Sequence, residues 1–463
     1  MLAALLCCLA FASPAQSFPD LKPSPQQTEW QDLEFGVILH FSTNTFLNRE
    51  WGDGTANPNI FNPSHFDPDQ WMSAIAASGA RYVVLVAKHH DGFCLWPTDQ
   101  TAYSIKQSPW KQGKGDMVAE VAAAAHRHGL KFGIYLSPWD RHEPKYADSA
   151  AYDKFYLAQL EELATRYGDL VEFWLDGAGS AGRTYNFAKI VETLRTYQPN
   201  TLVFADTALF EYADIRWAGS ETGKIDYENW NVIDRHGYLR WRPVEVDTPL
   251  RKLHWFWHPN DEASLKSLDE LIDSYENSVG RGGQWMLGVA PDDRGLLPDA
   301  DVQRLRQLGQ ALQARYAGNL LHPQAVPDRN TTDRKTPRKN TLGQNTTDQN
   351  IANALDGDDA TFWSAPPNST SSTLEVTLTH PITFNTALTM EWLNQGQAIQ
   401  RYRIEAWQHN AWVALTSGYA IGHEKIDHFT PITTDRVRLH ILSSTSAAHI
   451  REFQLFQQPT PTP

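Results

Sequence analysis

The chain has 463 residues, of which 41% are hydrophobic and 11% aromatic. That length predicts two or three domains, because compact domains take roughly 150 residues each. The 54 acidic and 40 basic residues give a net charge of −14, which argues against nucleic acid as a partner.

The chain begins with an apolar run over residues 2–12 that is followed by small residues. This order is typical of a secretory signal peptide. We therefore predict a signal peptide over residues 1–17 and a periplasmic or secreted protein. The run is too short to span a bilayer, and no membrane span is expected. Cys7 and Cys8 lie within the run, so the mature chain keeps Cys94, whose apolar neighbours predict a buried thiol.

From about residue 34 to residue 316, strand-like apolar runs alternate with amphipathic, helix-like segments. The runs predict strands at 35–41, 82–87, 132–136, 171–175, 202–205, 215–218, 254–257 and 285–289. Helical spacing predicts helices at 67–78, 116–128, 151–167, 186–197, 264–279 and 300–316. Strands that alternate with helices pair in parallel, and eight of them predict an α/β fold, a (β/α)8-like catalytic domain over residues 18–322. The stretch 206–253 fits least well, with a weak sixth strand and no clear helix.

The composition changes after the barrel. Residues 323–350 are rich in Pro, Asn, Thr and Asp, which is typical of a linker. Apolar residues then recur with a period of two at 374–378, 402–406 and 437–441. Alternating strands without helices predict an all-β sandwich over residues 351–463.

Polar residues that could take part in catalysis or binding follow several predicted barrel strands. They lie at the carboxyl ends of the strands, where such barrels assemble their active sites. They are His40, His89-His90-Asp91, Asp176 and Glu221. Taken alone, each of them could have a purely structural role, but their joint placement favours an active site. One Asp and one Glu on opposite sides of a barrel mouth are the pair of carboxyl groups that a retaining glycosidase uses.

A metal site is the competing interpretation of the histidines. His40, one of the neighbouring pair and Asp176 could meet around Zn²⁺ or Mg²⁺. Neighbours on a strand point to opposite faces, however, so His89 and His90 are poorly placed to share one ion. The sequence also has no HExxH motif and no paired cysteines. We therefore expect no catalytic metal.

Four segments of the barrel region stand out, namely GVILHFS at 36–42, AKHHDGF at 87–93, FGIYLS at 132–137 and FWLDG at 173–177. Together they resemble the α-L-fucosidases of glycoside hydrolase family 29. The resemblance implies that Asp176 is the nucleophile and that no cofactor is needed. It also implies a set of residues that hold the hydroxyl and methyl groups of fucose, namely His40, Glu50, Trp51, His89, His90 and Tyr135.

The segment RWAGSETG at 216–223 resembles the acid/base loop of the family branch that cleaves α-1,3 and α-1,4 linkages. The resemblance implies that Glu221 is the acid/base residue, with Asp226 and Glu228 as rivals nearby. Ser220 stands where that branch often has Asn. Trp257 resembles a sugar-facing position of the family, and a core tryptophan is the alternative.

The segment NALDGDDATFW at 353–363 resembles the start of discoidin-type sandwiches. Such domains often hold a structural calcium ion near the Asp-Gly-Asp turn, here Asp356-Gly357-Asp358. Many also bind sugars, and a purely structural appendage is the alternative.

Together these features predict an exported, retaining exo-α-L-fucosidase that removes α-1,3- or α-1,4-linked fucose from oligosaccharides or glycoconjugates. A broad-specificity fucosidase, a hydrolase of another sugar and a catalytically silent fucose-binding protein are the alternatives. To act as the acid, Glu221 must be protonated, so we expect burial and nearby negative charge to raise its pKa.

Overall fold

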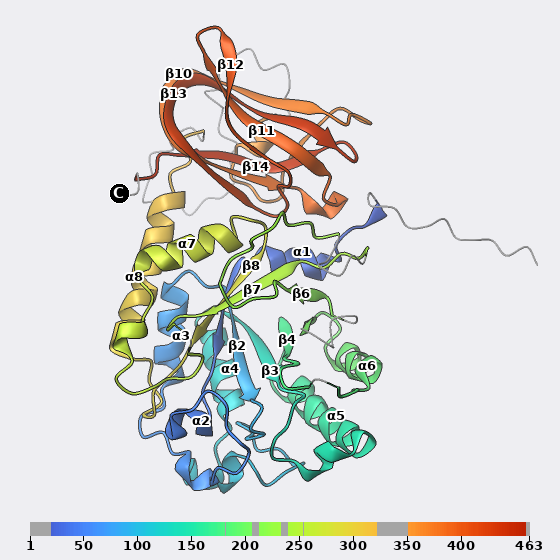
Figure 1. Ribbon diagram of the computed structural model, residues 1–463, viewed down its shortest axis with the longest axis vertical. Coiled ribbons are helices and arrows are strands. Elements are labelled where there is room, and N and C mark those ends of the chain that lie inside the picture. Colours follow the sequence, from blue (N-terminus) through green and yellow to red (C-terminus); the bar gives the residue numbers. More distant parts are fainter. Residues whose placement is uncertain are drawn as a thin grey trace, which may run out of the picture.

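The computed structural model describes residues 20–180, 182–205, 213–232, 239–252, 254–321 and 351–459. The predicted signal peptide and the predicted linker lie outside these ranges. Within them, no helix is both long and apolar enough to cross a bilayer. Figure 1 shows two parts, a barrel and a sheet domain at one of its ends.

Eight parallel strands form a closed barrel in chain order. They are β1 (Phe35–Leu39), β2 (Tyr82–Lys88), β3 (Lys131–Leu136), β4 (Glu172–Leu175), β5 (Leu202–Ala205), β6 (Ile215–Trp217), β7 (Val244–Pro249) and β8 (Gln284–Val289). Nearly every strand residue is buried, because the ring of helices covers one face of the sheet and the barrel interior the other. β1 pairs with β8 and closes the ring, with Leu39 opposite Val289. The predicted barrel is confirmed.

The helices that surround the barrel follow the predicted ranges closely. They are α3 (Pro68–Ala77), α4 (Met117–Arg127), α5 (Ser149–Arg166), α6 (Phe187–Tyr197), α7 (Leu268–Ser278) and α8 (Asp299–Tyr316). The short helices α1 (Pro25–Gln31) and α2 (Thr43–Leu47) flank β1. Side chains that accept first-turn N–H groups cap five of the long helices, namely Asp67, Asp116, Asp148, Asn186 and Ser267.

The predicted seventh strand was wrong. Residues 254–257 form an isolated bridge at His254 and then a bend. Strand β7 (Val244–Pro249) lies instead in the stretch that had fitted the alternation least well. The reason is chemical, because β7 alternates Val244 and Val246 with two buried carboxyl groups, Glu245 and Asp247. Because these carboxyl groups point inward, the sequence of a buried strand has the polar composition that is typical of a loop.

The second part is a six-stranded antiparallel sheet in the order β12-β11-β13-β10-β14-β9. Its strands are β9 (Trp363–Ser364), β10 (Ser372–Glu391), β11 (Ile399–Gln408), β12 (Ala411–Gly418), β13 (Lys425–Ser444) and β14 (His449–Phe456). The long strands β10 and β13 bend sharply (Figure 1) and their register shifts along the way. One core therefore joins Leu374 near the start of β10 with Ile404 on β11 and Phe453 on β14. The predicted strands at 374–378, 402–406 and 437–441 are confirmed within β10, β11 and β13.

The sheet domain packs against the amino ends of the barrel strands. Ile426 N donates to Gly280 O, 2.9 Å away and just before β8. Arg451 pairs with Asp32, 2.6 Å away and just before β1. The carboxyl ends of the strands, where the predicted site residues follow, face the other way (Figure 1).

Candidate active site

A pocket of about 260 Å³ opens at the carboxyl ends of the barrel strands. Eight of the nine predicted site residues line it, and Trp257 does not. The lining residues are Ile38, His40, Glu50, Trp51, His89, His90, Tyr135, Trp174, Asp176, Ala178, Phe204, Trp217, Glu221, Asp247 and Trp255.

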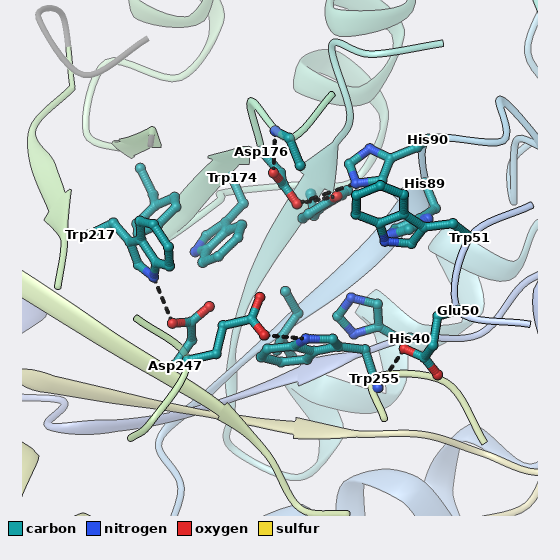
Figure 2. A pocket seen from close by; sticks show the side chains of 15 residues that line it. His40, Glu50, Trp51, His89, His90, Trp174, Asp176, Trp217, Asp247 and Trp255 are labelled. Atoms are coloured by element: carbon teal, nitrogen blue, oxygen red, sulfur yellow. Dashed lines mark hydrogen bonds and ion pairs between the residues drawn. The ribbon is translucent and has the colours of Figure 1, made fainter. Parts of the chain in front are cut away.

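Asp176 directly follows β4 and is held by bonds to both of its carboxyl oxygens. Ala178 N donates to Oδ1 at 2.8 Å, and the Tyr135 hydroxyl donates to Oδ2 at 2.9 Å. His90 Nε2 lies 3.6 Å from the same Oδ2. Figure 2 shows the carboxylate turned towards His90 across the pocket from Asp247. Such bonds fix the direction of the carboxylate, which a nucleophile needs.

The histidines form a neutral polar wall. Burial lowers the pKa of His40 to about 3, and burial also lowers the pKa of His89 well below its usual value. His90 Nδ1 bonds with Ser137 Oγ at 2.7 Å. In His40 and His89 the buried Nδ1 has no hydrogen-bond partner among the described residues. Neutral imidazoles can donate to or accept from hydroxyl groups without adding charge.

The expectation that His89 and His90 point to opposite faces was wrong. Both line the pocket, with ring centroids 4.1 Å apart. The alternation of side chains applies within a strand, and β2 ends at Lys88. Asp91 turns away from the pocket and accepts a bond from the Thr43 hydroxyl at 2.6 Å. Across the described residues, no group of three or more His, Cys, Asp or Glu side chains is placed to hold a metal ion.

Glu221 is an exposed residue in the loop that follows β6. Trp255 Nε1 donates to its Oε2 at 3.2 Å. Desolvation of the carboxyl group raises the pKa of Glu221, and the charges of Asp176 and Glu50 raise it further, against the bond from Trp255. The predicted upward shift is thus present. The rivals Asp226 and Glu228 do not line the pocket.

Glu50 holds residues 255–258 in place, where part of the seventh strand had been predicted. Its carboxylate accepts bonds from Trp255 N at 2.8 Å and Phe256 N at 3.2 Å, and it pairs with His258 Nε2 at 2.6 Å. This anchoring brings the indole of Trp255 into the pocket (Figure 2). Trp257, which had been expected there, is half-buried outside the pocket.

The aromatic side of the pocket was largely missed. Trp174, Phe204 and Trp217 line it near the carboxyl ends of β4, β5 and β6, and Asp247 adds a buried carboxyl group from β7. On the opposite side, Trp51 is 53% exposed and stands edge-on to His90. The alternation of residues 244–247 would have been the signal for Asp247.

The Asp-Gly-Asp turn of the sheet domain is closed by hydrogen bonds to the side chain of Asp356. Asp356 accepts bonds from Asp358 N and from the Thr361 hydroxyl, each 3.0 to 3.1 Å long. Within residues 351–459, no group of three or more His, Cys, Asp or Glu side chains is placed to hold a metal ion. Calcium binding there stays a prediction.

Comparison with known proteins agrees with this geometry. Residues 50–316 match the family described as Alpha-L-fucosidase, and residues 333–453 match the F5/8 type C domain. The chain is 34% identical over 436 residues to Alpha-L-fucosidase 1 of Arabidopsis thaliana, a match covering 89% of this chain and 83% of that protein. It is 35% identical over 453 residues to Putative alpha-L-fucosidase 1 of Oryza sativa subsp. japonica, covering 94% and 84%. A crystal structure of a putative alpha-L-fucosidase from Bacteroides thetaiotaomicron superposes with a TM-score of 0.84 at 32% identity, covering 95% of this chain and 98% of the other.

Proposed function

The chain belongs to the α-L-fucosidases of glycoside hydrolase family 29, and we propose that it removes terminal α-1,3- and α-1,4-linked L-fucose with retention of configuration. Asp176 attacks the anomeric carbon, and Glu221 protonates the leaving oxygen and then activates water. One observation carries this proposal: the two carboxyl groups line the same pocket in different electrostatic settings. Asp176 is held by two donors, whereas Glu221 has a raised pKa.

This difference suits the two roles. A nucleophile must be ionised and aimed, while the acid must still carry its proton near neutral pH. Donors to both oxygens of Asp176 favour an oriented carboxylate. The charge of Asp176 itself helps Glu221 to keep its proton. As Glu221 gives that proton to the leaving oxygen, it becomes the base for the second step.

The fucose is proposed to lie against the polar wall, where His40, His89 and His90 meet its hydroxyl groups as neutral imidazoles. Tyr135, Glu50 and Trp51 complete this part of the site, and Trp255 takes the aromatic place that was expected for Trp257. Hydrolysis is proposed to need only these side chains and water. Substrates would be fucosylated oligosaccharides or glycoconjugates outside the cytoplasm, where the apolar start of the chain would send the protein.

The linkage preference rests on the resemblance of the Glu221 loop. A neighbouring galactose on a branched acceptor would contribute binding energy that orients the scissile bond in the transition state. An aryl group or an α-1,2-linked glycan cannot offer a galactose in the same place. The exposed Trp51 and the indole of Trp255 at the rim provide surfaces on which such a sugar would stack.

Three substrates test the linkage proposal. We expect kcat/KM to be far higher on Lewis-type trisaccharides than on 2′-fucosyllactose or 4-nitrophenyl fucoside. Comparable values on all three, or a preference for the α-1,2 sugar, would place the chain among broad-specificity fucosidases. Retention is tested separately by NMR, since the fucose first released must be the α-anomer.

A further inference from the structure

β7 carries two carboxyl groups into the barrel interior, and each accepts a bond from an indole of the pocket. Trp174 Nε1 donates to Glu245 Oε1 at 2.7 Å, and Trp217 Nε1 donates to Asp247 Oδ1 at 2.7 Å. Figure 2 shows the second bond beside the pocket. Asp247 is 4% exposed and lines the pocket, yet nothing in the proposed reaction uses it.

The backbone of β7 clamps the acid/base loop at both of its ends. Ala218 N donates to Glu245 O at 2.9 Å where the loop leaves β6, and Gly223 N donates to Asp247 O at 3.2 Å where it returns. Gly223 has φ +73°, and a Cβ there would lie 2.8 Å from the Thr248 side chain. A side chain at position 223 would therefore force the returning end of the loop away from Thr248.

Trp217 connects this clamp to Glu221. It is the last residue of β6, four positions before Glu221, so its orientation sets where the loop starts. Asp247 thus meets the loop twice, at Trp217 through its side chain and at Gly223 through its backbone carbonyl. Side chains held in this way are what a precisely placed acid requires, because small displacements at an active site are costly.

We propose that Asp247 is a positioning residue for the general acid, fixing Trp217 and through it the loop that presents Glu221. The inference rests on the proposed acid role of Glu221 and deepens it.

The charge state of Asp247 fits this role. Burial raises its pKa well above the usual value, and the negative charges of Glu221 and Glu245 raise it further, against the bond from Trp217. A neutral carboxyl group can accept the indole N–H through its carbonyl oxygen. It does so without placing a permanent negative charge beside Glu221.

The test compares two substrates in the intact protein. One is a fucosylated trisaccharide, whose leaving group needs protonation, and the other is 2,4-dinitrophenyl fucoside, whose leaving group does not. Asp247→Leu removes the acceptor, and we expect kcat/KM on the trisaccharide to fall about 10-fold or more while kcat/KM on the aryl substrate falls by only a small part of that. The ratio kcat/KM reports the first step, in which only the trisaccharide needs the acid. Trp217→Phe removes the donor and should give the same pattern. Asp247→Asn keeps a carbonyl acceptor and should hold the ratio of the two rates within about 3-fold of the parent.

The controls separate the possible failures. Equal losses on both substrates in Asp247→Leu and Trp217→Phe would overturn the inference, as would a loss in Asp247→Asn as large as in Asp247→Leu. If Asp247→Leu does not fold, as judged by thermal melting, Trp217→Phe carries the test alone. Glu221→Ala must itself show the leaving-group dependence. If it does and the Asp247 and Trp217 variants do not, the inference fails while the proposed function stands, and if it does not, both fail.

The pH profile gives an independent readout. A neutral Asp247 leaves the pKa of Glu221 unchanged when it is replaced by Asn, so the basic limb of kcat/KM should stay in place. If Asp247 were ionised, Asp247→Asn would remove a negative charge beside Glu221 and lower the pKa of Glu221. The basic limb would then move to lower pH, and the neutral positioning role would be refuted.

Discussion

Replacing Lys88 by Met should destabilise the barrel strongly, because it leaves a buried carboxylate without its partner. Lys88 ends β2, directly before the histidine pair. Its Nζ lies 3.0 Å from Asp140 Oδ2 and donates to Gln159 Oε1 at 2.9 Å and to the Tyr152 hydroxyl at 3.3 Å. The side chains of the ion pair are 0% and 2% exposed.

Breaking a buried pair by removing one partner costs about 3–5 kcal/mol. At about 2 °C per kcal/mol for a large domain, Lys88→Met should lower Tm by about 6–10 °C. Burial alone would raise the pKa of Asp140, but the charge of Lys88 and the N–H groups of Glu143 and His142 hold it below its usual value. The ionised Asp140 therefore stabilises the folded state fully above the pKa that Asp140 has in the unfolded chain. This stabilisation is lost as the pH falls through the lower pKa of the folded state.

The variant reverses this dependence. Without the charge of Lys88, the N–H groups of Glu143 and His142 still oppose the effect of burial on Asp140, but we expect its pKa in the folded state to rise above the unfolded value. Stability should then fall as the pH rises above the unfolded value. The difference in free energy of unfolding between parent and Lys88→Met should therefore be largest near pH 7 and shrink towards pH 4. Urea unfolding at both pH values measures it, and Lys88→Met/Asp140→Asn should recover much of the loss. A difference below about 1 kcal/mol at pH 7 would refute the reasoning, because it lies within the range of an exposed ion pair.

Three further perturbations address the site and the domain contact. Asp176→Asn should reduce kcat by several orders of magnitude while Tm, measured by calorimetry, stays within about 2 °C; near-normal turnover would exclude Asp176 as the nucleophile. Trp255→Phe removes a bond that lowers the pKa of Glu221, so the basic limb of kcat/KM should move to higher pH, and a shift to lower pH would contradict the assigned acid. Arg451→Ala removes the ion pair with Asp32 at the opposite end of the barrel, so it should lower Tm without changing kcat/KM on an aryl fucoside; a large change in rate would mean that the two ends are coupled.

The parts of the site that sequence could predict lie where a simple rule applies. Asp176 follows a short apolar run, and His40 follows another, so both fall at the carboxyl ends of barrel strands. No long-range contact is needed to place them at one face. Most of the barrel was predictable for the same reason, since its buried strands are apolar runs, whereas β7 is equally buried but carries carboxyl groups.

The missed features depend on contacts between distant segments. Glu245 and Asp247 are stable inside the barrel because indoles from β4 and β6 donate hydrogen bonds to them. The sequence around residues 245–247 does not identify these distant donors. Likewise, Trp255 faces the pocket because Glu50, 205 residues away, holds its backbone. The sequence around Trp255 and Trp257 offers two similar aromatic side chains and no local means to choose between them.

The closure of the barrel between β1 and β8 constrains how the protein is made. Leu39 finds its partner Val289 only after about 250 more residues have been synthesised, which takes a ribosome roughly 12–50 s. During that time β1, an entirely apolar strand, has one edge that nothing in the chain can yet cover. Such edges invite association with other chains. We therefore expect the yield of active protein to depend on temperature and chaperone supply during translation more than on the stability of the finished barrel.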